Sequence, residues 1–409
     1  MLQEQFVIRD GELVKYTGDD ETVVIPDGVT SIGDSAFSYL DDLVRVVIPD
    51  SVVYIRTWAF TECPSLETIH IPRNVQCIDC RAFDNCYALR TIKVSPQNAG
   101  YCAEDGVLFS RDKTTLVCFP EGMNRQSYTV PDGVKRIGAY AFYGCSRLQT
   151  VRLPDSVRTI GKHAFSFCRA LTDISFPTQM ESIGEAAFFD CSKLRKAILP
   201  QGIPLIAYEM CSGCKSLETV QIPDSVTRIE TNAFEDCERL QNVRIPPNVT
   251  EIGKTAFYGC MALRTVHIPD SVTMLGWGVF GGCGGICSAI IGNGVREIPD
   301  AAFAGCWKMA RIKLPQTLTR IGRGAFSSCE TLRFVHYAGM PEERDAVRLE
   351  HDNEELFDAR WIYASENGHR LSVNSDSKLS GKGFLSVLTG EVARGKSSLL
   401  KALVESDLP

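Results

Sequence analysis

Residues 222–240, IPDSVTRIETNAFEDCERL, and residues 245–263, IPPNVTEIGKTAFYGCMAL, carry the same pattern 23 residues apart. Prolines mark this pattern along the chain at positions 26, 49, 72, 131, 154, 177, 200, 223, 246, 269 and 315, and Gly292 fills the one missing place. Twelve full units result, each approximately L-x-x-V-x-I-P-D-S-V-T-x-I-G-x-x-A-F-x-x-C-x-x. A fixed period of this length indicates a repeat architecture.

Each unit has about six apolar side chains to bury. An Ile or Leu follows each proline place by six residues, and a Phe follows by eleven, except at Cys211. One unit cannot offset its chain entropy alone, so stacked units must bury each other's faces. The L-x-x-V-x-I segment alternates as a short strand, and A-F-x-x-C-x-x-L has the spacing of a short helix or 3₁₀ turn. The sequence therefore predicts a solenoid of stacked short parallel strands.

The stretch VVIPDGVTSIGDSAF (residues 23–37) and the two stretches quoted above resemble the BspA-type leucine-rich repeat. The resemblance covers about residues 22–337. It implies a recognition scaffold of the kind associated with bacterial cell surfaces and with gut bacteria, and it carries over no catalytic residue.

The departures from the repeat predict the domain organisation. Residues 1–24 are expected to form a capping hairpin, and 25–337 the solenoid. An insertion at 97–130 is expected to project as a hairpin with strands at 106–109 and 116–119, either as a binding element or as a tolerated decoration. Residues 338–364 are expected to form a C-terminal cap with a helix and a last strand, and 365–382 a linker.

Eleven of the 17 cysteines share one repeat position, which Leu40 occupies in the first repeat. A position that accepts leucine is a packing position, so a ladder of buried, reduced thiols is expected. Cys77-x-x-Cys80 and Cys211-x-x-Cys214 resemble half of a zinc site, but no second pair follows at the required spacing, so no metal is predicted. Cys102 and Cys118 could pair in an oxidising compartment.

The outward positions of the strands carry many basic residues. They are expected to lie on the concave side of the solenoid, as a basic stripe on an otherwise acidic chain of net charge -7. The candidate binding residues are His70, Lys93, Arg152, Arg195, Lys196, Arg244, Arg264, His267, Arg311, Lys313 and His336. Such a stripe fits a protein or an anionic ligand, although a solvated face that merely keeps the strands soluble gives the same pattern.

The tail contains GEVARGKS at 390–397, which satisfies G-x-x-x-x-G-K-[ST]. An apolar run precedes it and a helical pattern follows, so residues 383–409 resemble the start of a P-loop nucleoside triphosphatase. The resemblance implies that Gly390, Gly395, Lys396 and Ser397 would bind a magnesium nucleotide. Because one strand and one helix cannot form the whole nucleotide-binding domain, this part is predicted to be truncated, and a chance match is the alternative.

Two functions are compatible with these observations. The first is a non-catalytic scaffold that binds a protein or ligand, and the second is a sensor module of a P-loop enzyme mostly absent from the chain. No apolar run is long enough for a membrane span, and sparse aromatic residues disfavour specific nucleic-acid binding. A monomer is expected, in the cytoplasm because no signal-peptide pattern is visible, with the cell surface as the alternative.

Overall fold

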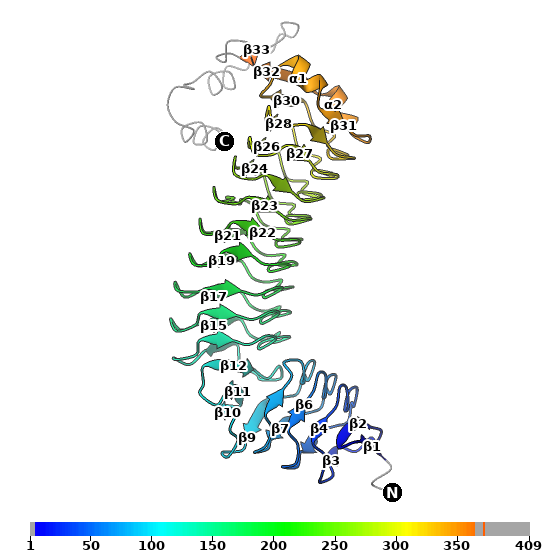
Figure 1. The fold of residues 1–409 in the computed structure, drawn as a ribbon, viewed down its shortest axis with the longest axis vertical. Helices are drawn as coiled ribbons and strands as arrows, with labels where there is room; N and C mark the ends of the chain where they lie inside the picture. Colours follow the sequence, from blue (N-terminus) through cyan, green and yellow to red (C-terminus); the bar gives the residue numbers. More distant parts are fainter. Residues whose placement is uncertain (1–4, 365–370, 373–409) are drawn as a thin grey trace.

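The computed structural model describes residues 5–364 and 371–372. Within them the chain is a solenoid of stacked turns with almost no helix (Figure 1). Most turns contribute one strand to each of two parallel ladders, and the turn that contains Asn242 contributes only an isolated bridge to the first. The long-strand ladder comprises β3 (Thr22–Val24), β5 (Arg45–Val47), β7 (Thr68–Ile71), β9 (Thr91–Val94), β13 (Ser127–Thr129), β15 (Thr150–Arg152), β17 (Asp173–Ser175), β19 (Lys196–Ile198), β21 (Thr219–Gln221), β24 (Thr265–Ile268), β26 (Ser288–Ile291), β28 (Arg311–Leu314), β30 (Phe334–Tyr337) and β32 (Arg360–Ala364).

The short-strand ladder is built from the residues around the repeated isoleucine. It comprises β4 (Ser31–Ile32), β6 (Tyr54–Ile55), β8 (Cys77–Ile78), β14 (Arg136–Ile137), β16 (Thr159–Ile160), β18 (Ser182–Ile183), β20 (Leu205–Ile206), β22 (Arg228–Ile229), β23 (Glu251–Ile252), β25 (Met274–Leu275), β27 (Glu297–Ile298), β29 (Arg320–Ile321) and β31 (Arg348–Leu349). Each ladder is divided into several sheets, within which neighbouring strands of the repeats pair in parallel with matching repeat positions opposite each other, as Ile137 pairs with Ile160. The register follows directly from the constant 23-residue period.

The third side of the repeats is neither the short helix nor the 3₁₀ turn that the sequence predicts. In the repeat around Phe165, residues His163 and Phe167 adopt positive φ angles of 52° and 61°. Their amides and that of Phe165 donate to carbonyls of the next repeat, at Glu185, Ala187 and Phe189, all at 2.8 Å. Left-handed residues interrupt the succession of right-handed residues that a helix needs, and the amides bond across the stack instead. The helical spacing of the apolar residues therefore arises from a hydrogen-bonded turn.

Phenylalanine side chains stack along the axis inside this turn. Phe142 and Phe165 have ring centroids 4.8 Å apart, and Phe165 and Phe188 5.3 Å apart, with interplanar angles of 10° and 4°. All three rings are buried. Cys211 is buried at the same position and interrupts the stack before Phe234. Parallel rings at one repeat spacing give every turn the same interface with its neighbours.

The eleven cysteines that share one repeat position, here called the ladder cysteines, have a specific role in this interface. Each of the eleven is buried, and each thiol donates to a backbone carbonyl of the previous repeat, as Cys168 does to Phe142 at 3.0 Å. Leucine fills the same space in the first repeat but cannot donate this bond. The structure thus contains the buried ladder of reduced thiols that the sequence predicts.

Burial should protect these thiols from alkylation. It raises the pKa of Cys63 to about 11 and disfavours the reactive thiolate, whereas Cys77 and Cys80 are exposed. Under native conditions we expect iodoacetamide to modify Cys77 and Cys80 first and to leave the eleven ladder cysteines unmodified, as measured by peptide mass spectrometry. The same reaction in denaturant is the control and should modify all of them. Native labelling of Cys168 at the rate of Cys77 would contradict the buried ladder.

The insertion forms a junction between two parts of the solenoid. It contains β10 (Tyr101–Glu104), β11 (Val107–Ser110) and β12 (Thr115–Cys118), of which β10–β11 and β11–β12 pair antiparallel. Figure 1 shows them between the blue and cyan turns and the green turns. β12 then pairs in parallel with β14, so the insertion continues the short-strand ladder. β13, within the predicted insertion, belongs to the long-strand ladder because it pairs with β15.

The insertion does not project from the array as the sequence predicts. One apolar core extends from Leu13 to Leu108, and a second includes Val107 and Phe109 and ends at Ala359. Since alternate residues of a strand point to opposite sides, β11 contributes to both cores. Its Val107, Leu108 and Phe109 side chains are buried because each closes the open end of one stack.

Two acidic side chains lie at this junction, of which Asp84 is buried and Glu121 is half-buried. Asp84 is 7% exposed and binds Arg81, with Nε and Oδ2 2.6 Å apart. Burial raises the pKa of Asp84 to about 6 although the Arg81 charge opposes this shift. Glu121 follows β12, and burial together with the Asp84 charge raises its pKa to about 8. The folded chain therefore favours a protonated Glu121.

Glu121→Gln should stabilise the fold at high pH. The folded pKa of Glu121, about 8, lies above the unfolded value, so its contribution is fully present below pH 4.5 and is lost as the pH rises through 8. A neutral glutamine escapes this loss, which is on the order of 2 kcal/mol. We expect a higher urea midpoint for the variant at pH 8.5 and equal midpoints at pH 4. The exposed Glu181→Gln is the control, and a pH-independent difference would contradict the assignment.

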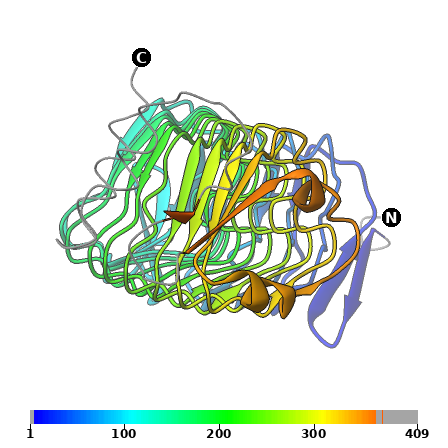
Figure 2. The ribbon, with the colours of Figure 1, turned by 90° about the horizontal axis from the view of Figure 1, so that it is seen from above.

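Both ends depart from the repeat. β1 (Phe6–Arg9) and β2 (Glu12–Tyr16) form an antiparallel hairpin, and β2 pairs in parallel with β4. After β30 the chain forms α1 (Pro341–Asp345), β31, α2 (Glu355–Asp358) and β32, and β33 (Leu371–Ser372) pairs antiparallel with β32. Figure 2, viewed along the stack, shows α1 and α2 on the last turn.

Candidate functional site

The long strands present three outward positions in each turn, which together form a surface that we name the long-strand face. In β28 these are Arg311 and Lys313, preceded by Ala310. The inward Ile312 between them is buried. Because successive strands lie roughly 4.8 Å apart, equivalent side chains form rows along the stack. This is the face that the sequence predicts to be concave.

The structure places ten of the eleven predicted residues at the surface of this face. Eight are exposed: His70, Lys93, Arg152, Arg195, Lys196, Arg244, Arg264 and Lys313. His267 and Arg311 are half-buried.

His336 is the exception, because its side chain is only 8% exposed. It lies between Lys313 of β28 and Ile362 of β32 in the parallel register. Burial, together with the charges of Arg311 and Lys313, lowers the pKa of His336 to about 4. The prediction that His336 is an accessible binding residue is therefore wrong. The repeat pattern could not show this, since β32 lies outside the repeats.

The basic residues do not form a continuous stripe. In the middle of the face, β17 carries Asp173 and Ser175, β19 ends at Ile198, and β21 contributes Thr219 and Gln221. Arg195 and Lys196 lie within these turns, and most of the other basic residues gather on either side of them. We name Arg45, His70, Arg90 and Lys93 the N-terminal basic group, and Arg244, Arg264, His267, Arg311, Lys313, Arg333 and Arg360 the C-terminal basic group.

The C-terminal basic group has no acidic residue among the outward positions of its own turns. From Gln241 to Ile362 these positions hold basic, small, amide or apolar residues only. Acidic residues occur beside the group, in the turns after the strands, where Asp224 pairs with Arg244 at 2.7 Å. Phe334 is the large aromatic residue of the group and is 37% exposed. The group is thus a positive area with a small apolar centre.

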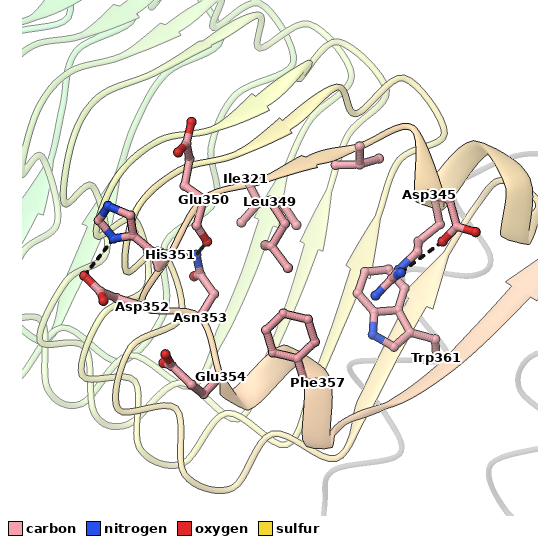
Figure 3. A pocket seen from close by; sticks show the side chains of 12 residues that line it. Ile321, Asp345, Leu349, Glu350, His351, Asp352, Asn353, Glu354, Phe357 and Trp361 are labelled. Atoms are coloured by element: carbon pink, nitrogen blue, oxygen red, sulfur yellow. Dashed lines mark hydrogen bonds and ion pairs between the residues drawn. The ribbon is translucent and has the colours of Figure 1, made fainter.

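A separate pocket of about 540 Å³ lies at the C-terminal end of the stack, between α1, β31, α2 and β32 (Figure 3). Its apolar lining includes Leu349, Phe357 and Trp361, and Phe357 is 68% exposed. Its charged rim is internally paired, since Arg344 binds Asp345 at 3.0 Å and stacks over Trp361. The repeat pattern does not predict this pocket, although two aromatic residues outside the repeat, Phe357 and Trp361, were a signal for it.

Neither a metal centre nor a disulfide is formed by the described residues, which include every cysteine. No group of three or more metal-binding side chains occurs among them. Cys102 of β10 and Cys118 of β12 lie on opposite sides of β11, roughly 10 Å apart, which is too far for a disulfide. Both are free thiols. The proposed pairing of these two residues is therefore wrong.

The predicted nucleotide site lies outside the described residues. This applies to Gly390, Gly395, Lys396 and Ser397 and to most of the expected linker. Magnesium nucleotide binding stays a prediction from the sequence.

Residues 14–104, 115–241 and 227–340 match the family described as BspA type Leucine rich repeat region (6 copies). The chain belongs to this family. Because these matches include both sides of the junction, the BspA-type repeats account for the two parts of the solenoid alike.

Solved structures of leucine-rich repeat proteins are similar to this chain. A leucine-rich repeat protein from Eubacterium ventriosum is 26% identical, with a TM-score of 0.54 over 66% of this chain and 88% of that protein. One from Bacteroides ovatus is 25% identical, with a TM-score of 0.51 over 88% of each chain. A leucine rich cell surface protein from Faecalibacterium prausnitzii is 28% identical over 80% of this chain and 62% of that protein, with a TM-score of 0.33. No curated protein matches the chain.

Among the described residues, no helix has the length and apolar character that crossing a membrane requires.

Burial of His336 should make the fold acid-sensitive. Its folded pKa, about 4, lies below its unfolded value near 6.5, so its contribution to stability is present above pH 6.5 and is lost as the pH falls through 4. The loss amounts to at most ~3 kcal/mol. We expect the urea midpoint of His336→Gln to fall less than that of the wild type between pH 7.5 and pH 4.5. The exposed His70→Gln should behave as the wild type, and equal falls in all three proteins would refute the argument.

Proposed function

We propose that this chain is a non-catalytic scaffold that binds an acidic protein through its C-terminal basic group. The observation that carries the proposal is the absence of acidic residues at the outward positions from Gln241 to Ile362, where seven basic residues gather. A chain of net charge -7 that concentrates positive charge on one face favours anionic partners there. Parallel strands hold these side chains in fixed rows, which reduces the entropy lost on binding.

The composition of the face favours a protein over a single-stranded nucleic acid. Single strands are bound by stacking of bases on several aromatic side chains, and Phe334 is the large aromatic side chain at this end of the face. Guanidinium groups instead form paired hydrogen bonds with carboxylates, and Arg264 and Arg333 are exposed for this purpose. Ile290, half-buried between the basic strands, supplies apolar contact.

The two ends support this role by closing the stack. We infer that β1 and β2 cap the first turn, since β2 pairs with β4. At the other end, the buried Leu356 of α2 packs within the second core. Capped ends leave the long-strand face as the extended binding surface of the solenoid. The cytoplasmic location stays a prediction, with the cell surface as its alternative.

Charge reversal within the C-terminal basic group should weaken binding of an acidic polypeptide. With polyglutamate as the probe at low salt, we expect Arg264→Glu/Lys313→Glu/Arg333→Glu to raise Kd at least about tenfold, measured by biolayer interferometry. The matched control, Arg45→Glu/Arg90→Glu/Lys93→Glu, reverses the N-terminal basic group and should change Kd by less than about twofold.

Two results would count against this proposal. The first is an equal loss of polyglutamate affinity in both triple variants, which would indicate a general effect of net charge. The second is tighter binding of single-stranded DNA than of polyglutamate of the same length, which would place the face with nucleic-acid binders.

A further inference from the structure

The long-strand ladder has an open edge at its N-terminal end. Among residues 5–364, β3 pairs with β5 and with no other strand. The hairpin β1–β2 extends the short-strand ladder instead, through the pairing of β2 with β4. Figure 1 shows β3 at the N-terminal end of the stack beside this hairpin. At the opposite end, the last long strand β32 is followed by β33.

Successive residues of β3 direct their backbone amide and carbonyl groups alternately toward β5 and toward the open side of the ladder. The amide of Ile25 donates to Val47 at 3.0 Å, and that of Arg45 donates to Glu21 at 3.0 Å. In a parallel ladder, alternate residues bond to opposite neighbours, so Thr22 and Val24 direct their amides and carbonyls to the open side. Both residues are exposed, Val24 by 62%. These groups offer two donors and two acceptors to an added strand.

The end of this edge at which the chain enters β3 is acidic, whereas Arg45 lies opposite Thr22 on the neighbouring strand β5. Where the chain enters β3, a hollow of about 220 Å³ is lined by Asp19, Asp20, Asp41, Asp42 and the ring of Tyr39, among others. The four aspartates are exposed, as is Tyr39, by 73%. The Tyr16 hydroxyl donates a hydrogen bond to Asp20 Oδ2 at 2.5 Å, which fixes this wall of the hollow to the hairpin strand β2. Carboxylates beside an aromatic face suit an ammonium or guanidinium group.

We propose that β3 binds an extended basic segment of a partner protein, which adds as a further strand. Its backbone pairs with Thr22 and Val24, an apolar side chain packs on Val24, and a Lys or Arg side chain enters the hollow near Tyr39. The charge of the edge selects this occupant. A second copy would bring its own four aspartates to an edge that is already acidic, and like charges repel. The site is independent of the C-terminal basic group.

A synthetic peptide tests this proposal without a known partner. The probe is fluorescein-labelled Lys-Leu-Val-Thr-Val-Lys, measured by anisotropy with the full chain, and its counterpart has glutamate at both ends. We expect saturable binding of the lysine peptide and at least about tenfold weaker binding of the glutamate peptide. N-methylation of alternate peptide amides, in both registers, should abolish binding in one register and spare the other, because one set faces β3.

Protein variants complete the experiment. Asp41→Asn/Asp42→Asn leaves the backbone of β3 unchanged. It should raise the Kd of the lysine peptide at least about fivefold. Val24→Pro removes an outward amide that the native ladder does not use, so it should also weaken binding of the lysine peptide. If this variant fails to fold, the N-methylated peptides test the same hydrogen bonds. The triple variant Arg264→Glu/Lys313→Glu/Arg333→Glu should bind the peptide as the wild type does, so failure here is distinguishable from failure of the proposed function.

Three results would overturn the proposal. They are absence of lysine-peptide binding at millimolar concentration, equal binding of both N-methylated registers, and a dimer in sedimentation equilibrium that Val24→Pro abolishes. The last result would assign the edge to a second copy of the chain.

Discussion

Every turn of this protein depends on the next one to satisfy its backbone. The long strands, the short strands and the turns around Phe165 and its equivalents all direct amides across the stack to the neighbouring repeat. A single turn would leave these groups and the faces of its apolar residues in water, so it has no stable structure alone. The constant register, the phenylalanine stack and the thiol ladder all follow from this one requirement, because each needs identical residues at identical heights.

The same requirement explains which features the sequence could predict. The 23-residue period located the buried isoleucines, the phenylalanines and the cysteines, since burial at a fixed position leaves a periodic trace. It could not distinguish a helix from a turn, because the apolar spacing of A-F-x-x-C-x-x-L suits both. The difference lies in left-handed residues such as His163 and Phe167. Many of these are not glycine, so their conformation leaves no mark in the sequence.

The candidate site was predictable to the same extent. Outward positions on the strands followed from alternation, and most of the predicted basic residues are at the surface. His336 was misplaced because the segment that buries it, β32, comes from outside the repeat. The open edge of β3 was also missed, because pairing partners of the end strands depend on where the hairpin β1–β2 attaches. Features that recur in every repeat can therefore be predicted from the sequence, whereas features that depend on how the two ends of the chain pack cannot.

The division of the apolar core at β11 has a mechanical consequence. In a solenoid, cooperativity passes only between adjacent turns, and here the two apolar cores meet at one antiparallel strand that contributes to both. Loss of structure that starts at the N-terminal turns can propagate to this strand and halt, because the turns beyond it remain closed by Val107 and Phe109. Under tension applied to its ends, the molecule would thus unfold in two steps, one for the turns on each side of the junction.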